Sequence, residues 1–238
     1  MGKARSGIQA ATPPKIASPA TPSPLAWPRL ERPSVPHALI QPAPGILLID
    51  NFFPLRIRKA FLAFLTAPNS PIKLNPPTAP KRGEAERTNE RTSLHDQGLA
   101  GRLWNDTGLR EACQEMEGRS GRRAVGLNPN MRIYRYPPGS FFGPHYDDDN
   151  IVEGLGVTEW TLLIYLTGNL TGKEDGVVGG ETAFYPSPNR KGNGPAIVPE
   201  LKAGRALLHR HGQHCSLHEG RLVEQGEKWV LRSDVVFA

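Results

Sequence analysis

The chain has 238 residues, enough for one large domain with a tail. Its formal net charge is +6, but residues 1–44 hold five Lys or Arg against one Glu, which leaves only +2 for the remainder. A nearly neutral remainder argues against a nucleic-acid-binding face, because such a face needs Lys and Arg clustered on the domain itself. No run of about 18 apolar residues occurs, so no transmembrane helix is expected.

The two cysteines and the N-terminal composition bear on compartment and domain limits. Cys113 and Cys215 have no CxxC partner, so neither a disulfide framework nor a cysteine zinc site is predicted. A reducing intracellular compartment, cytoplasmic or nuclear, is therefore expected. Residues 1–44 contain ten of the 24 prolines among Ala, Ser and Thr and show no periodicity. They predict a disordered tail, with the folded domain covering residues 45–238.

The first part of this domain, residues 45–129, is predicted to be a helical support. Residues 45–50 form a short apolar run bounded by turn formers, which is typical of a buried strand. A helix is expected to begin at Pro54, because proline favours the first helical turn. The apolar face of this helix would consist of Ile57, Phe61, Phe64 and Leu65.

A loop and a second helical region follow. Residues 66–84 carry five prolines and no pattern, so they predict a long loop, and such loops often lie beside a functional site. A helical region is expected over about residues 96–117, and Cys113 within it is predicted to be a core residue. The apolar residues at helical spacing there are Leu109, Ala112, Cys113 and Met116.

From residue 130 onward, short β-type runs alternate with Gly and Pro, and no helical pattern intervenes. Strands of this length and spacing predict a sandwich or a jelly-roll barrel, here over residues 130–238. Helices first and strands after is the order expected for helices packed against one barrel. The predicted fold class is therefore mainly β with N-terminal helices. The predicted strands cover residues 131–136, 158–166, 182–185, 205–211 and 229–237.

The pair His145 and Asp147 is the first candidate for metal binding. Two residues apart on a strand, both side chains would point to the same face. One imidazole and one carboxylate make up part of the facial triad of non-haem Fe(II) oxygenases, which a histidine from a distant strand would complete. Asp148 and Asp149 could ligate in place of Asp147, although the one-residue gap favours Asp147.

The C-terminal segment offers four histidines for that third position, and spacing has to choose among them. His209 and His211 alternate along a predicted strand, where they could be core-edge residues or could support the metal ligands from behind. His214 is expected in a loop. His218 opens a segment rich in Gly and charged residues that precedes the last predicted strand.

A resemblance to a known family follows from four blocks of residues that occur in order. Over about residues 45–238 the chain resembles the prolyl 4-hydroxylase type of 2-oxoglutarate and Fe(II)-dependent dioxygenases. This resemblance implies a double-stranded β-helix (jelly-roll) barrel. The matching blocks are Tyr136, Gly139, Phe142 and His145; Thr161, Tyr165 and Leu166; Gly179 to Thr182 with Phe184; and His218, Gly220, Val223, Gly226 and Lys228.

The resemblance also implies roles for individual residues. His145, Asp147 and His218 would bind Fe(II). Lys228 would pair with the far carboxylate of 2-oxoglutarate, which suits a fixed cation. Arg232 is a rival anchor, because an offset of four keeps the same face of a strand. Further hydrogen bonds to the co-substrate are expected from Thr161 or Tyr165 and from Tyr136.

The implied activity is hydroxylation of a C–H bond with O2 and 2-oxoglutarate, releasing succinate and CO2, with ascorbate supporting activity. The expected substrate is a protein side chain such as proline, or a small molecule, and no nucleic acid or membrane partner is expected. Asn89 and Arg91, close in sequence to the long loop, are candidates for a substrate rim. The alternatives are a non-catalytic binding module on the same barrel and a nucleic-acid demethylase. The acidic residues Glu219, Glu224 and Glu227 after His218 count against the demethylase.

Overall fold

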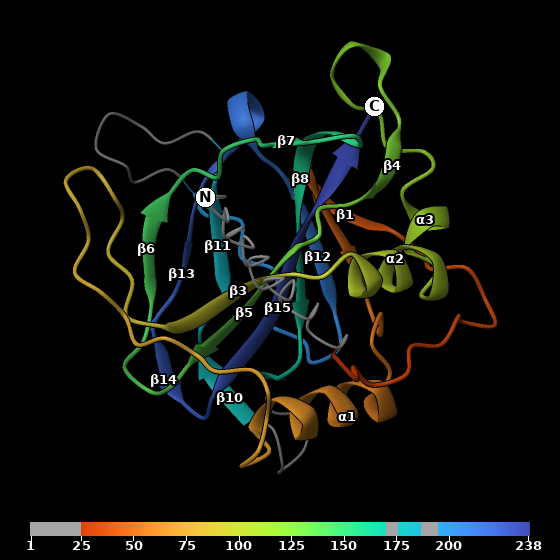
Figure 1. Ribbon diagram of the computed structural model, residues 1–238. Helices are drawn as coiled ribbons and strands as arrows, with labels where there is room; N and C mark the ends of the chain where they lie inside the picture. Colours follow the sequence, from red (N-terminus) through yellow and green to blue (C-terminus); the bar gives the residue numbers. More distant parts are fainter. Residues whose placement is uncertain (1–24, 170–175, 187–194) are drawn as a thin grey trace, which may run out of the picture.

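The computed structural model describes residues 25–169, 176–186 and 195–238 (Figure 1). The helices in these ranges are α1 (Leu55–Thr66), α2 (Gln97–Asp106) and α3 (Leu109–Ala112), with short 3-10 turns at η1 (Arg119–Gly121) and η2 (Gly212–His214). The strands are β1 (Ile40–Ala43), β2 (Ile46–Ile49), β3 (Glu90–His95), β4 (Ala124–Leu127), β5 (Asn130–Tyr136), β6 (Phe142–His145), β7 (Ile151–Val152), β8 (Gly156–Tyr165), β9 (Gly168–Asn169), β10 (Gly176–Gly179), β11 (Thr182–Tyr185), β12 (Ala206–Arg210), β13 (Leu217–Gly220), β14 (Val223–Gln225) and β15 (Lys228–Phe237).

One large sheet and two small ones build the fold. The large sheet has the strand order β1-β2-β12-β8-β15-β5-β3, with β4 also pairing β15 and β7 also pairing β8. The small sheets have the orders β11-β13-β6 and β14-β10-β9. The pairs are antiparallel except β9 with β10. Figure 1 shows β6, β13 and β11 on the side of the molecule opposite α2 and α3. This arrangement confirms the predicted jelly-roll barrel with supporting helices.

Alternation along β8 sends successive side chains to the two faces of the large sheet. Leu162 and Ile164 belong to the hydrophobic core on the helix side. Tyr165 and Leu163 belong instead to the core inside the barrel. Because a strand has a period of two, this one segment serves both layers, and the polar Thr161 shares the interior face.

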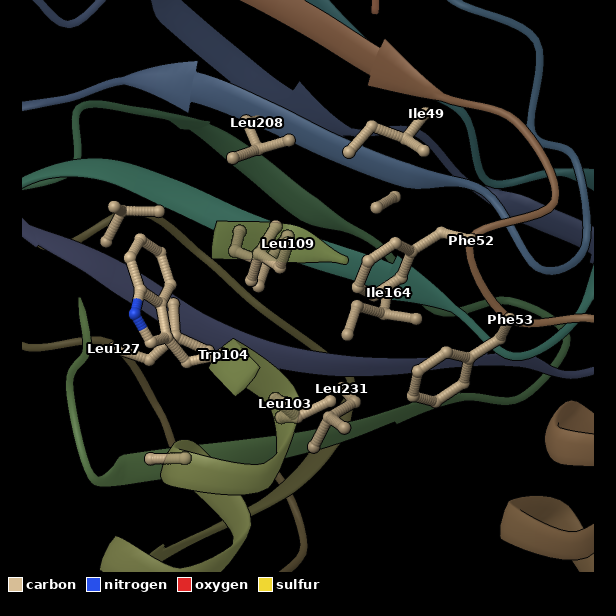
Figure 2. Packing of buried hydrophobic residues seen from close by; sticks show 14 of the residues in the cluster. Ile49, Phe52, Phe53, Leu103, Trp104, Leu109, Leu127, Ile164, Leu208 and Leu231 are labelled. Atoms are coloured by element: carbon tan, nitrogen blue, oxygen red, sulfur yellow. The ribbon is translucent and has the colours of Figure 1, made fainter. Parts of the chain in front are cut away.

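The helix-side core is shown in Figure 2. Leu103, Trp104 and Leu109 from α2 and α3 pack near the sheet residues Ile164 and Leu231. Leu103 and Leu109 are fully buried. Burying one such side chain contributes about 1.5–3 kcal/mol, so this layer holds the helices on the sheet.

The second predicted helical region is divided in two. Asp96 caps α2 by accepting a hydrogen bond from the backbone N–H of Leu99 at 2.7 Å. The helix ends at Asp106, and Gly108 adopts φ +76° before α3 begins. A residue in this left-handed conformation cannot continue a right-handed helix, which explains the break. Cys113 is buried after α3, as predicted, and burial raises its thiol pKa to about 12.

Residues 25–44 correct the expectation of a disordered tail that extends to residue 44. Trp27 is buried, and the centroid of its ring lies 4.9 Å from that of the Phe64 ring. Its indole N–H donates to the Asp96 carboxylate at 2.7 Å. Strand β1 pairs with β2. The proline-rich composition of this segment gave no sign of the few residues that pack against the domain. The packed domain therefore begins before residue 45. The predicted tail over residues 1–24 lies outside the described residues.

The other strand predictions agree with the structure to within a few residues. The predicted runs correspond to β2, β5, β8, β11, β12 and β15. Several short strands were not predicted, and β3, with mainly polar and charged residues, is the longest of those in the large sheet. It is an edge strand paired with β5, and its side chains alternate between half-buried and exposed. No helix in the described part of the chain is long and apolar enough to cross a membrane.

Candidate metal and co-substrate site

Two histidines face each other across a strand pair. His145 ends β6, and it lies directly opposite His218 of the antiparallel neighbour β13. The ring centroids are 4.2 Å apart. Asp147 lies just beyond the end of β6 rather than on the strand, yet its carboxylate still reaches the two rings. One ligand atom from each of the three residues lies within 4.8 Å of the others.

Backbone carbonyls determine how these two rings present their nitrogens. Nδ1 of His145 lies 2.8 Å from the Gly143 carbonyl, and Nδ1 of His218 lies 3.0 Å from the Ser216 carbonyl. A carbonyl only accepts hydrogen bonds, so each Nδ1 carries the hydrogen and each Nε2 has a free lone pair. Burial lowers the pKa of His145 to about 4 and also lowers that of His218, which keeps both rings neutral at pH 7.

Asp147 is buried and ionised. Its Oδ1 accepts from Nη1 of Arg232 at 3.1 Å, and its Oδ2 accepts from the Thr161 hydroxyl at 2.9 Å. Burial opposes ionisation, but the Arg232 guanidinium holds the pKa of Asp147 well below its ordinary value. Asp148 is exposed, and Asp149 pairs with Arg119, so neither neighbour competes for this position.

A chain of hydrogen bonds supports the Asp147 carboxylate from behind. Thr161 donates to Asp147, so its oxygen accepts from Nδ1 of His211 at 3.0 Å. Nε2 of His211 then accepts from the Thr158 hydroxyl, also at 3.0 Å. Thr161 was expected to contact the co-substrate, but its hydroxyl is directed to the carboxylate. His211 therefore lies behind the site, which is one of the two positions predicted for it. His214 is exposed in η2.

Lys228 lines a narrow cavity together with His145, Asp147 and His218. Its Nζ donates to the Gly180 carbonyl at 2.6 Å and lies 4.9 Å from the centroid of the Tyr136 ring. No carboxylate forms an ion pair with Lys228 within the ranges that the structure describes. Burial lowers the pKa of Lys228 to about 8. An enclosed ammonium group facing a metal-type cluster suits a dianionic ligand that spans the two.

The tyrosines near Lys228 differ in access to this cavity. Tyr136 lines the cavity, and Tyr165 does not. The Tyr165 hydroxyl lies 2.8 Å from the hydroxyl of Thr182, which does line the cavity. Burial raises the pKa of Tyr165 to about 12, so it stays a phenol. Thr182 was not among the predicted site residues. Its position directly after the Gly-Gly-Glu turn was the available signal.

Arg232 shares the interior face of β15 with Lys228, as predicted, but has different partners. Its Nη1 donates to Oδ1 of Asp147, as described above. Its Nη2 lies 3.0 Å from Oδ2 of Asp147 and 3.4 Å from Oδ1 of Asp234. A guanidinium that contacts both oxygens of Asp147 fixes that carboxylate. The structure therefore gives the two cations separate positions, with Lys228 in the cavity and Arg232 on the carboxylate.

A wider cavity of about 660 Å³ opens on the other side of His145 and Asp147. Arg91, a predicted rim residue, is part of its wall. Asn89 is not, because its side chain is buried and its amide donates to the Glu90 carbonyl at 3.0 Å. The prediction of Asn89 as a rim residue was wrong: the segment forms the start of an edge strand instead of an open loop. The charged and aromatic wall also includes Arg87, Arg132, Arg232, Tyr134, Phe142 and Tyr146.

Comparison with known proteins agrees with this geometry. Residues 131–233 match the 2OG-Fe(II) oxygenase superfamily. A prolyl hydroxylase from Trichoplax adhaerens, solved with a hypoxia inducible factor oxygen degradation domain peptide fragment, has a TM-score of 0.57 and 16% identity, covering 81% of this chain and 83% of that chain. A 2OG-Fe(II) oxygenase family oxidoreductase from Burkholderia pseudomallei has a TM-score of 0.53 and 18% identity, covering 81% and 85%. Comparison with curated proteins finds no match.

The jelly-roll barrel and the polar cluster inside it are typical of the class of non-haem, metal-dependent oxygenases. Within that class, the match over residues 131–233 is to the 2OG-Fe(II) oxygenase superfamily, and the similar solved structures include a prolyl hydroxylase. This similarity implies Fe(II), with 2-oxoglutarate and O2 as co-substrates. The donor set fits the metal, because neutral imidazoles and an ionised carboxylate converge there.

Proposed function

We propose that the chain binds Fe(II) through His145, Asp147 and His218 and hydroxylates a C–H bond of a protein side chain, with proline as the first candidate. The observation that carries this proposal is the narrow cavity that connects these three residues with Lys228. Bound Fe(II) and 2-oxoglutarate would supply the oxidising chemistry from O2, with release of succinate and CO2. Ascorbate would serve as a supporting reductant.

The protein's own groups would bind and orient. Lys228 would hold the far carboxylate of 2-oxoglutarate, next to Tyr136 and Thr182. Arg232 and Thr161 keep the Asp147 carboxylate in one orientation. Such supporting contacts usually matter for metal affinity, because they hold the ligands in a geometry that the metal can use.

The wider cavity is the proposed substrate site. It shares His145 and Asp147 with the co-substrate cavity, so a bound side chain would lie beside the metal. The prolyl hydroxylase from Trichoplax adhaerens, whose structure contains a peptide fragment, supports a peptide as substrate. In the described part of the chain, neither Arg87 nor Arg91 has an ion-pair partner. These arginines favour a peptide with an acidic residue near the target proline.

The first experiment is an anaerobic titration of the protein with Fe(II) and then 2-oxoglutarate. Chelation would give the weak visible metal-to-ligand charge-transfer band, and we expect this band to be absent in His218→Ala and retained in Asp148→Ala, a change at an exposed neighbour. If Fe(II) binds and no band forms, the proposed co-substrate chelation is wrong. If His218→Ala keeps the band, the ligand assignment is wrong.

The substrate is tested separately by succinate formation and peptide mass. Proline-containing peptides with acidic and with basic flanking residues are compared at equal concentration. A mass increase of one oxygen, greater with acidic flanks and lost in Asp147→Ala, is expected. Turnover that is coupled to a free amino acid or a nucleic acid, and not to any peptide, would contradict the proposed substrate class.

A further inference from the structure

A fully buried carboxylate connects two arginines near the proposed metal and substrate sites. Asp234 of β15 has no exposed surface. Its Oδ1 lies 3.4 Å from Nη2 of Arg232, and its Oδ2 lies 3.6 Å from Nη1 of Arg132. The side-chain amide of Asn128 also reaches Oδ2, at 3.5 Å. Each oxygen of Asp234 therefore faces a different arginine.

Strand register brings the two arginines together. Arg132 of β5 lies directly opposite Arg232 of β15 in the large sheet. Side chains directly opposite each other share a face of the sheet, and two like charges in such a pair repel each other. Asp234 is two residues further along β15, so it shares that face and supplies an opposite charge to both arginines.

The two arginines have different surroundings. Arg232 contacts both oxygens of Asp147, a proposed metal ligand. The Arg132 side chain is 20% exposed and forms part of the wall of the wider cavity. Within the described part of the chain, its guanidinium group has no ion-pair or hydrogen-bond partner other than Asp234. The remaining N–H groups of Arg132 can therefore bind an anion in that cavity.

Arg132, Asp234, Arg232 and Asp147 follow one another from the wider cavity to the metal site, and we term them the charge chain. Two guanidinium groups and two carboxylates give it no net charge. Inside a protein, charges are screened less than in water, so a change at one end alters the affinity for a dication at the other. We propose that the charge chain couples metal binding at Asp147 to recognition of an acidic substrate group by Arg132. This inference rests on the proposed function and deepens its substrate class.

The coupling has a defined direction. An anion that pairs with Arg132 offsets a positive charge near the metal site, so it strengthens binding of a dication at Asp147. By reciprocity, the bound metal strengthens binding of the acidic group by the same factor. Arg132 is then a specificity-determining residue, and Asp234 is a positioning residue that acts through the two arginines.

The first test measures the Fe(II) affinity of the full-length protein by anaerobic competition with a chelator. Asp234→Asn should weaken Fe(II) binding by about tenfold, the usual cost of losing a supporting contact. Arg132→Gln should instead strengthen it severalfold, because a positive charge is removed and Asp234 is left to Arg232 alone. The double variant should lie close to the wild type. A lower affinity in all three variants would show a purely structural role and overturn the inference.

Arg91→Gln is the matched control. Arg91 lines the same cavity, and in the described ranges it has no ion pair that would link it to Asp147. Its substitution should leave Fe(II) affinity unchanged. An increase equal to that in Arg132→Gln would mean that the link through Asp234 is not needed. If thermal unfolding shows that Asp234→Asn does not fold, the comparison of Arg132→Gln with Arg91→Gln still decides the question.

The second test repeats the competition in the presence of a peptide. A proline-containing peptide with aspartates next to the proline is compared with its asparagine counterpart. The aspartate peptide should raise Fe(II) affinity severalfold and the asparagine peptide should not, and Arg132→Gln should abolish the difference. An aspartate peptide that binds equally well with and without Fe(II) would overturn the coupling. Failure of the proposed function would look different, because Fe(II) affinity would then be unchanged in His218→Ala.

Discussion

Lys228 and Arg232 lie four residues apart on β15 and face the same interior, yet they have different partners. Lys228 is enclosed by tyrosine rings and a carbonyl, whereas Arg232 contacts two carboxylates. A guanidinium matches the two oxygens of Asp147, and a compact ammonium group suits a cavity that has to remain open for a ligand. Spacing alone could show that both residues share a face, but not which of them would be free to bind an anion.

The lowered pKa of Lys228 leads to a prediction about pH. Burial lowers this pKa to about 8, so the ammonium group loses its proton above that pH, and a neutral amine cannot pair with a carboxylate. The affinity of the metal-loaded protein for 2-oxoglutarate should fall by up to about tenfold per pH unit above pH 8. Calorimetric titration from about pH 7 to about pH 9.5 measures this.

The control for this prediction is Lys228→Arg, which stays charged over the whole range. Its affinity for 2-oxoglutarate should be independent of pH, although the larger side chain could bind more weakly. A wild-type affinity that does not change with pH, or an equal decline in Lys228→Arg, would contradict the assignment of Lys228 as the anchor.

Thr161 and Thr182 provide a matched pair of hydroxyls, one behind the Asp147 carboxylate and one in the wall of the co-substrate cavity. The Thr161 hydroxyl donates to Asp147, and the Thr182 hydroxyl lines the cavity next to Tyr165. Thr161→Val should weaken Fe(II) binding by about tenfold, because it removes a support of the carboxylate. Thr182→Val should leave metal affinity unchanged and raise the KM for 2-oxoglutarate. If Thr161→Val changes only the KM for 2-oxoglutarate, Thr161 contacts the co-substrate, which is one of the two alternatives, Thr161 or Tyr165, that the family resemblance implies.

At the scale of elements, pairing between strands brings together residues that lie far apart in the chain. The β6 and β13 pair places His145 opposite His218, and the β8 and β12 pair places Thr161 opposite His209. These partners are 73 and 48 residues apart in the chain. Segment patterns predicted six of the fifteen strands in the described residues, but they did not predict this register. The pairing of Thr161 with His209 therefore became visible only in the structure.

The break between α2 and α3 leads to a prediction at this scale. Gly108 has φ +76°, and an added Cβ would lie 3.0 Å from a Pro33 side-chain atom. Gly108→Ala should therefore lower the free energy of unfolding by about 1–2 kcal/mol. In the control, Gly101 lies within α2, and an added Cβ would meet no atom within 4 Å. Gly101→Ala should raise the free energy of unfolding by about 0.5–1 kcal/mol, because alanine is the better helix former.

Urea unfolding of both glycine variants measures these changes. The opposite signs separate a conformational effect from a general effect of added volume. If Gly108→Ala is as stable as the wild type, the left-handed turn is not needed to end α2.

At the scale of the whole molecule, the pattern of apolar residues in the sequence predicted the barrel and the helices. It did not predict segments whose buried positions are not marked by apolar residues. Strand β3 carries Glu90, Arg91 and His95 on its two faces, so its alternation of half-buried and exposed positions is not visible as alternating hydrophobicity. The His-x-Asp pair and the family resemblance together predicted the residues that meet in the barrel. The segment over residues 25–44 was misjudged for a related reason, since a few buried side chains are enough to anchor a proline-rich stretch.

Trp27 leads to the last prediction, because it joins this N-terminal segment to α1 and to the N-terminus of α2. Its ring packs on Phe61 and Phe64, and its indole N–H donates to Asp96. Trp27→Ala should lower the free energy of unfolding by about 3–5 kcal/mol. Trp27→Phe keeps the ring contacts and loses one hydrogen bond, so it should cost only about 1 kcal/mol. Val35→Ala, at a side chain that is 70% exposed, should be neutral.

The N-terminal segment packs on the helix side of the large sheet, whereas the proposed site lies in the barrel on the other side. The Trp27 variants should therefore unfold more easily and still bind 2-oxoglutarate with wild-type affinity at a temperature where they remain folded. Chemical denaturation and calorimetric titration of the same samples check both parts. Wild-type stability in Trp27→Ala would mean that residues 25–44 do not contribute to the domain, and the originally predicted start at residue 45 would then describe the folded unit.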